Sequence, residues 1–244
     1  MPRYKIELSY DGSNYFGWQR QPDVPSVQDT IESCLTKLRS NTATEVVGCG
    51  RTDTGVHAHH YVLHLDFDPI SDFEQFGFKL NKMLPDDIAI QSVKVADDDF
   101  HARFNAIERT YRYFIHRKKQ PFLVNQSWYF TQELDLGAMN KAANNMVGKK
   151  NFTSFSKLHT DVKTNICDVR SAKWFEQDDH RIYFEIRADR FLRNMVRATV
   201  GTLVDVGLGK IQPDDINSIL EAKNRQAASV SVPPQGLYLW EICY

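Results

Sequence analysis

Residues 48–60 read GCGRTDTGVHAHH, a dense polar stretch between two segments that are expected to form strands, near 45–47 and 61–67. Gly50 and Gly55 bracket four residues in it, a composition typical of a tight turn that needs unusual backbone angles. A loop between two strands lies at the end of a sheet, where binding residues collect. The stretch is therefore expected to be a shaped loop that presents polar side chains.

The segments on either side of this loop repeat one order of elements. Apolar periodicity predicts βαββαβ in the first half, with Ser26 as the N-cap of the first helix. The elements are expected near residues 3–10, 26–40, 45–47, 61–67, 72–83 and 88–95. The same order returns near residues 110–116, 136–146, 167–175, 181–188, 191–206 and 237–242, with an extra helix near 214–222 and an edge strand within 122–131.

This repeated order predicts the fold class. We expect an α+β fold of two tandem ferredoxin-like units that form a mixed, mainly antiparallel sheet with helices on one face. Residues 1–100 are assigned to an N-terminal unit that carries the polar loop, and residues 101–244 to a C-terminal unit. An open, partly basic sheet face in such a fold is a natural platform for RNA.

Composition limits the classes of protein to consider. The 244 residues are 42% hydrophobic and 25% charged, which is ordinary for a globular protein. The first residues, MPRYKIELSYDG, do not have the pattern of a signal peptide, and no apolar run reaches membrane-spanning length. We therefore expect a soluble, cytoplasmic protein. The four cysteines lack CxxC spacing and are interpreted as reduced and structural.

The charge balance bears on nucleic-acid binding. Lys and Arg total 30 against 31 Asp and Glu, a formal net charge of −1. This argues against a protein that holds nucleic acid by bulk charge, because phosphate contacts draw on Lys and Arg. A local basic groove remains compatible with this balance.

The histidines near the loop suggest a metal site as an alternative. If the segment continues as a strand, His57 and His59 share one face, whereas His60 and His64 share the other. Two carboxylates, at positions 66 and 68, fall in step with the second pair. A site of three ligands is thus compatible with the spacing but not required by it. A plain turn, with Asp53 capping a backbone amide, is a further alternative.

Motifs for phosphate-binding loops and for nucleophile elbows do not occur in the sequence. The stretch GRTDTGVHA, in contrast, strongly resembles the signature GRTDxGVHA of the tRNA pseudouridine synthase A (TruA) family. Other stretches agree in order, so the resemblance covers nearly the whole chain. They are YDGSNYFGWQRQP, SVQDTIE, FHARFNAIERTYRY, FLRNMVRATVGTLVDVG and PPQGLYLWEICY.

The resemblance implies a set of site residues. It makes Asp53 the catalytic aspartate, Tyr111 the active-site tyrosine and Arg197 the basic partner of the aspartate. Leu237 would be the apolar residue that packs in the pocket, and Arg51 would help to hold the target base out of its stack. The two tandem units predicted above agree with the fold of this family.

The resemblance also implies an activity. Members of the family isomerise uridine to pseudouridine in the anticodon arm of tRNA, around positions 38 to 40 of the RNA, as homodimers without a cofactor or a metal. A carboxylate suits this reaction because it can stabilise or capture positive charge at the anomeric carbon. Whether Asp53 attacks the sugar, attacks the base or removes a ribose proton stays open at this point.

The other site residues have physical roles in such a reaction. A guanidinium beside the carboxylate favours its charged form, and Arg197 and Arg193 are expected one turn apart on the helix at 191–206. Tyr111 and Tyr113 are expected on one face of a strand, where the ring of Tyr111 can stack on a uracil that has left the helix.

Two alternatives to the synthase are a non-catalytic RNA-binding protein on the same scaffold and a metal-dependent hydrolase built on the histidines. A wider tRNA footprint is expected from basic residues that position phosphates. The candidates are Arg103, Arg109, Arg112, Arg117, Lys118, Lys119, Lys149, Lys150, Arg187 and Arg190.

Overall fold

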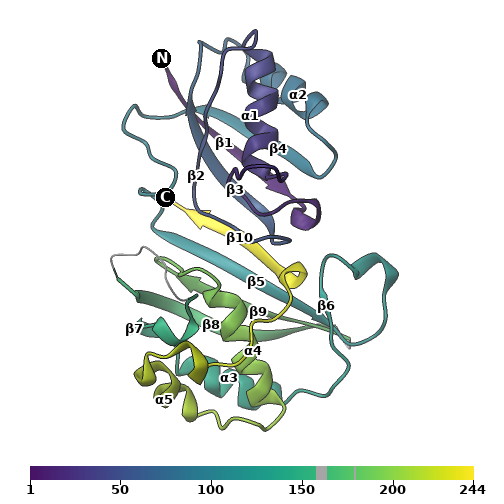
Figure 1. The fold of residues 1–244 in the computed structure, drawn as a ribbon, viewed down its shortest axis with the longest axis vertical. Helices are drawn as coiled ribbons and strands as arrows, with labels where there is room; N and C mark the ends of the chain where they lie inside the picture. Colours follow the sequence, from purple (N-terminus) through teal and green to yellow (C-terminus); the bar gives the residue numbers. More distant parts are fainter. Residues whose placement is uncertain (158–163, 179) are drawn as a thin grey trace. The chain divides into compact units, whose positions relative to one another are not determined.

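The computed structural model describes residues 1–157, 164–178 and 180–244. They form two compact units (Figure 1). The first comprises Met1–Ile107 together with Tyr238–Tyr244, and the second comprises Glu108–Leu237. The division expected from the sequence, 1–100 and 101–244, differs from this one in the placement of residues 101–107 and of the last strand.

The first unit has the element order βαββαβ. Its elements are β1 (Arg3–Tyr10), α1 (Val27–Leu38), β2 (Val47–Gly48), β3 (His57–Asp66), α2 (Phe73–Met83) and β4 (Ile88–Val95). Strand β1 pairs antiparallel with β3 on one side and with β4 on the other. Strand β3 pairs antiparallel with β2 and, at its beginning, in parallel with β10 (Leu237–Cys243).

Alternation along the sequence explains this sheet. In β1, RYKIELSY, every second residue is buried, from Tyr4 to Tyr10, as a strand with one face against the core requires. Strand β3 has strands on either side of it in the sheet, and its residues are buried on both faces from Tyr61 to Leu65. Both helices of the unit lie together on one side of its sheet (Figure 1).

The elements of the second unit lie between Glu108 and Leu237. Its elements are β5 (Glu108–His116), β6 (Trp128–Tyr129), α3 (Leu136–Asn144), β7 (Gly148–Asn151), β8 (Ile166–Asp178), β9 (Arg181–Ala188), α4 (Met195–Gly207) and α5 (Asp215–Ala222). The strands run in the order β5-β9-β8-β7 with antiparallel pairs, and β6 pairs in parallel with β5. Helix α3 packs against β8 and α4.

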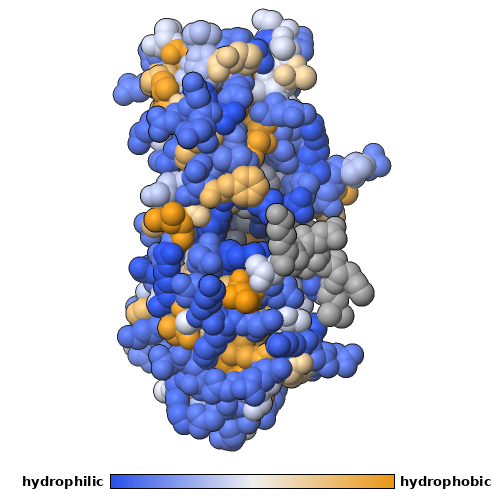
Figure 2. Space-filling view, turned by 90° about the vertical axis from the view of Figure 1, so that its left-hand side faces the viewer, coloured by the Kyte–Doolittle hydropathy of each residue, from blue (hydrophilic) through white to orange (hydrophobic). Residues whose placement is uncertain are grey.

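These elements confirm the predicted α+β class, the tandem ferredoxin-like units and the mainly antiparallel pairing. In the second unit the order βαββαβ is completed by β10, whose residues from Tyr238 onward belong to the first compact unit. Within the described ranges, no helix is long and apolar enough to span a membrane. On the face drawn in Figure 2, hydrophobic residues form separate small groups on a mainly hydrophilic surface.

The helix expected at 191–206 begins later than predicted. Asn194 has a φ of +66°, in the left-handed region, and α4 starts at Met195. Arg193 therefore lies before the helix, and the expectation that Arg193 and Arg197 lie one turn apart on it is wrong. Helix α4 is also buried around most of its circumference.

Other differences concern short elements. The edge strand expected within 122–131 is only Trp128–Tyr129, preceded by a 3-10 turn at Pro121–Leu123. Strand β3 begins at His57, four residues earlier than expected, so the last four residues of the polar stretch are strand and not loop. Strand β7 was not predicted, since its sequence GKKN lacks apolar alternation.

The N-cap of α1 yields a prediction about stability. The Ser26 hydroxyl accepts the backbone N–H of Asp29 at 3.2 Å, and Ser26 is fully buried. Ser26→Ala is expected to lower the free energy of unfolding by about 1 kcal/mol in urea denaturation. Asp214 is the matched control because it occupies the N-cap of α5 without a side-chain capping bond. Asp214→Ala should cost less than about 0.5 kcal/mol, and equal losses would contradict the capping role.

Candidate active site

The polar loop connects β2 to β3 and contains a tight turn. The N–H of Val56 donates to the carbonyl oxygen of Asp53 at 3.1 Å, and Gly55 between them has a φ of +74°. Asp53 is thus the first residue of a four-residue turn whose third position needs a left-handed backbone. Gly50, in contrast, is not among the residues with positive φ and faces open space, so the prediction that it needs unusual backbone angles is wrong.

A second loop, which follows β1, holds this turn by its backbone. Gly55 donates its N–H to the carbonyl oxygen of Tyr15 at 3.2 Å, and Trp18 donates its N–H to the carbonyl oxygen of Thr52 at 3.3 Å. A Cβ on Gly17 would lie only 2.4 Å from that same oxygen of Thr52, and Gly17 has a φ of +93°. The two backbones are in such close contact that no side chain fits between them.

An aromatic cluster lies beneath the loop and is formed by Tyr10, Trp18 and Tyr61. The rings of Trp18 and Tyr61 stack with centroids 4.0 Å apart, and Tyr10 packs on Tyr61 at 5.6 Å. The hydroxyl groups of Tyr10 and Thr52 lie 2.9 Å apart, and the Tyr61 hydroxyl donates to the carbonyl oxygen of Gly50. Sequence reasoning did not identify this cluster as part of the site.

Asp53 and Arg51 therefore occupy one clamped loop in the first unit. The side chain of Asp53 is half-buried, whereas Arg51 is exposed. Such an arrangement holds one carboxylate in a defined position and leaves a cation two residues away at the surface. The geometry is compatible with a loop that presents both side chains to a ligand.

Tyr111 and Tyr113 lie in β5 of the second unit, on one face of the strand as predicted. Their cross-strand partners in β9 are Ile186 and Phe184. The Tyr111 ring is half-buried and meets the ring of Phe191 edge-on, with centroids 5.0 Å apart. Tyr113 is fully buried, so it belongs to the core, and Tyr111 is the more accessible of the two.

Arg197 and Leu237 are brought together with Tyr113 by the segment 232–237. The Arg197 Nε donates to the carbonyl oxygen of Val232 at 2.7 Å, and the Tyr113 hydroxyl donates to that of Pro233 at 2.8 Å. Burial raises the pKa of Tyr113, and the nearby charge of Arg197 acts in the opposite direction. Leu237 is the last residue of this segment and is buried. Of the predicted residues, the second unit thus contains Tyr111, Arg197 and Leu237.

Several candidate phosphate-binding residues make contacts within the second unit. Arg112 and Arg187 both contact the buried carboxylate of Glu185 at 2.8 Å. The Arg109 side chain donates to the carbonyl oxygen of Asp189 at 2.8 Å. These arginines stabilise the sheet and its adjoining loop, whatever further contacts they make.

The histidines of β3 pack against neighbouring segments. The Nδ1 atom of His57 accepts the N–H of Gly12 at 3.0 Å, and its ring stacks on Tyr238. His59 stacks on Trp240, with ring centroids 4.1 Å apart. Stacking thus attaches strand β10 to the first unit.

The carboxylates considered for a metal site form ion pairs with arginines. Asp66 forms an ion pair with Arg3 at 2.8 Å, and Asp68 forms one with Arg39 at 2.9 Å. Across residues 1–157, 164–178 and 180–244, no group of three or more His, Cys, Asp and Glu side chains is placed to hold a metal ion.

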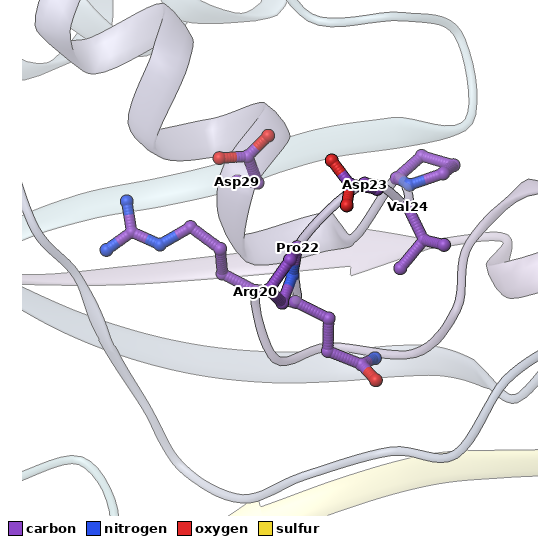
Figure 3. A pocket seen from close by; sticks show the side chains of 7 residues that line it. Arg20, Pro22, Asp23, Val24 and Asp29 are labelled. Carbon is purple, nitrogen blue, oxygen red and sulfur yellow. The ribbon is translucent and has the colours of Figure 1, made fainter.

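A surface hollow of about 670 Å³ lies beside the N-terminal end of α1 and is lined by residues 20–25 and Asp29. Figure 3 shows Arg20 extending to one side of it, with Asp23 and Val24 on the other. Arg20 forms an ion pair with the buried carboxylate of Glu32 at 3.2 Å. None of the predicted site residues lines this hollow, so it is separate from the candidate site.

Comparisons with known proteins identify the family of this chain. The profile of a family described as tRNA pseudouridine synthase matches residues 8–105 and 142–244. The chain is 47% identical over 245 residues to tRNA pseudouridine synthase A of Bacteroides fragilis, covering 99% of this chain and 96% of the relative. It is 42% identical over 245 residues to the protein of that name from Bacillus subtilis, covering 99% of each.

The tandem ferredoxin-like units are therefore the framework of an RNA-modifying isomerase. The chain belongs to the tRNA pseudouridine synthase family. The family and the class of enzyme expected from the sequence are both confirmed.

The contact between Gly17 and Thr52 gives a prediction about the loop. Gly17→Ala is expected to displace residues 52 and 53, because alanine disfavours a φ of +93° and its Cβ would overlap the Thr52 oxygen. The free energy of unfolding should fall by at least about 2 kcal/mol, as measured by urea denaturation.

The control for this change is Gly50→Ala in the same loop. A Cβ at Gly50 meets no atom within 4 Å, so the stability of this variant should match that of the wild type. If Gly17→Ala were as stable as Gly50→Ala, the close backbone contact would not be a constraint on the loop.

His64 is expected to make the free energy of unfolding depend on pH. Its Nδ1 accepts the N–H of Ala102 at 3.1 Å, and burial, reinforced by the charge of Arg3, lowers its pKa to about 4. In the unfolded chain the pKa of His64 is near 6.5. The contribution of His64 to the free energy of unfolding is therefore fully present above pH 6.5 and falls as the pH decreases toward 4. Through this one group the free energy of unfolding changes by at most about 1.4 kcal/mol per pH unit.

The measurement is urea denaturation at pH values between 4.5 and 7.5. His64→Asn keeps an acceptor near the position of Nδ1 but cannot be protonated in this range. This variant should lose less stability on acidification than the wild type. Parallel pH profiles for the two proteins would show that His64 does not supply the dependence.

Proposed function

We propose that this protein isomerises uridine to pseudouridine in the anticodon arm of tRNA, around positions 38 to 40, with Asp53 as the catalytic carboxylate. The observation that carries the proposal is the half-buried Asp53 at the start of a turn whose backbone is fixed by a second loop. Family membership supports the reaction and the RNA substrate. We further propose that it acts in the cytoplasm as a homodimer without a cofactor.

The reaction exchanges one bond for another within a single nucleotide. The bond between the ribose C1′ and the uracil N1 breaks, the uracil turns, and C1′ bonds to C5. The hydrogen on C5 leaves as a proton, and N1 gains one. Since no electrons are gained or lost overall, the chain needs a group that stabilises positive charge at C1′ and a way to move a proton. A carboxylate that attacks the sugar supplies the first. The same carboxylate can instead add to the base, or remove a ribose proton and so act in proton transfer.

The other residues are proposed to support this step. Tyr111, half-buried at the surface of its strand, provides a ring that can stack on the uracil and a hydroxyl that can assist proton transfer from C5. Arg197 is proposed as the basic partner of the carboxylate, and Leu237 as an apolar contact for the base. A uridine in a stem must leave its stack before the reaction, and the exposed Arg51 is proposed to keep it out.

The decisive variant is Asp53→Asn, which keeps the shape of the side chain but removes its charge. Incubated with an unmodified tRNA and no cofactor, the wild type should produce pseudouridine in the anticodon arm. Asp53→Asn should produce none, while its affinity for tRNA stays within about threefold. Carbodiimide labelling with primer extension locates the product, and filter binding measures affinity.

Asp86→Asn is the matched control, because Asp86 is an exposed aspartate of the first unit outside the loop. It should retain full activity. Product formation by Asp53→Asn would refute the catalytic role. Absence of product from the wild type, on a tRNA that it binds, would favour a non-catalytic RNA-binding protein instead.

A further inference from the structure

We infer that Tyr10 and Thr52 are a positioning pair for the catalytic carboxylate, in which the hydrogen bond between their hydroxyl groups fixes the backbone that carries Asp53. The inference rests on the proposed role of Asp53 and extends it to two residues that do not contact the substrate. It assigns a role in the reaction to a threonine of the polar loop and to the last residue of β1.

Both members of the pair are inside the protein. Tyr10 is 4% exposed and Thr52 is 8% exposed, and their hydroxyl oxygens are 2.9 Å apart. Buried hydroxyl groups of this kind need a hydrogen-bonding partner, because leaving one unpaired costs its full desolvation. Thr52 is also held by its carbonyl oxygen, which accepts the N–H of Trp18. The residue before Asp53 is therefore fixed at both its side chain and its backbone.

The phenol of Tyr10 is itself held in place. Its backbone pairs with Ala58 in β3 and with Ile88 in β4, so the residue is anchored between two neighbouring strands. Its ring packs against Tyr61 and Trp18 at centroid distances of 5.6 and 6.3 Å. A tyrosine has only two side-chain torsions, so a packed ring keeps its hydroxyl at a defined point.

A second hydroxyl of the aromatic cluster reaches the loop on the other side of Arg51. The Tyr61 hydroxyl donates to the carbonyl oxygen of Gly50. A Cβ on Gly48 would lie 2.1 Å from the same hydroxyl oxygen, which shows how closely the chain is packed there. Gly50 and Thr52 are thus tied to two rigid rings, and Arg51 between them remains exposed.

This geometry predicts a specific kinetic effect. Catalytic groups must be held to within about 0.5 Å, and a displacement of about 1 Å can cost on the order of 100-fold in rate. Tyr10 and Thr52 are both buried and offer little surface to an RNA. Loss of their hydrogen bond should therefore lower the rate of the chemical step and leave the affinity for tRNA unchanged.

The test measures two quantities for each variant: the single-turnover rate of pseudouridine formation at saturating unmodified tRNA, and the Kd for the same tRNA. The variants are Tyr10→Phe, Thr52→Val, the double variant Tyr10→Phe/Thr52→Val, and Thr52→Ser, which keeps the hydroxyl. Tyr4→Phe is the matched control. Tyr4 lies on the same face of β1, is 2% exposed, and uses its hydroxyl to accept the N–H of Ile70, outside the loop.

Tyr10→Phe and Thr52→Val are each expected to lower the single-turnover rate by roughly 10- to 100-fold, with the Kd within about twofold of the wild type. Thr52→Ser should recover most of the rate. The double variant should be no slower than the slower single variant, because both remove the same bond. Tyr4→Phe should react at the wild-type rate.

Either of two results would overturn the inference: Tyr10→Phe reacting as fast as Tyr4→Phe, or multiplicative losses in the double variant. If Thr52→Val does not fold, Tyr10→Phe and Thr52→Ser decide the question. Asp53→Asn is measured in parallel to separate the two proposals. Activity in Asp53→Asn would refute the proposed function, whereas an inactive Asp53→Asn with a fully active Tyr10→Phe would refute only the positioning pair.

Discussion

The backbone contact between the loop after β1 and the loop before β3 is the constraint on which the candidate site depends. At this contact the Cα of Gly17 faces the carbonyl oxygen of Thr52, and the adjacent Trp18 donates its N–H to the same oxygen. Contacts this close do not tolerate adjustment, since any side chain at position 17 would push the two loops apart. The position of Asp53 is therefore determined by main-chain geometry together with the rings below it, and not by the flexible ends of surface side chains.

Much of the fold could be predicted from local sequence, and the reason is visible in particular elements. Strand β1 alternates because one of its faces is buried, and α1 begins at a serine that caps it. The start of α4 could not be predicted, because the periodicity of its apolar residues continues through Asn194 although the backbone there is left-handed. Strand β7 depends on its pairing with β8, a tertiary contact with no signature in GKKN.

The candidate site was only partly accessible to sequence reasoning. Spacing drew attention to the loop around Asp53, and the family signature assigned its role, but neither pointed to Tyr10 or Tyr61. Their function depends on where hydroxyl groups fall in space, and the residues they reach are 42 and 11 positions away in the chain. The aromatic residues of the first unit could have been flagged as candidates, yet only the structure separates Tyr10, which meets the loop, from Tyr4, which does not.

The pairing of β10 with the beginning of β3 bears on how the chain acquires its structure during synthesis. Tyr238 and Leu239 pair with His57 and Ala58, so residues separated by about three quarters of the sequence complete one unit. Contacts of such high sequence separation form late, because a long loop must close first. While the ribosome is still producing the second unit, the beginning of β3, which follows the polar loop, therefore lacks its partner β10. The beginning of β3 completes its pairing only after β10 has been made.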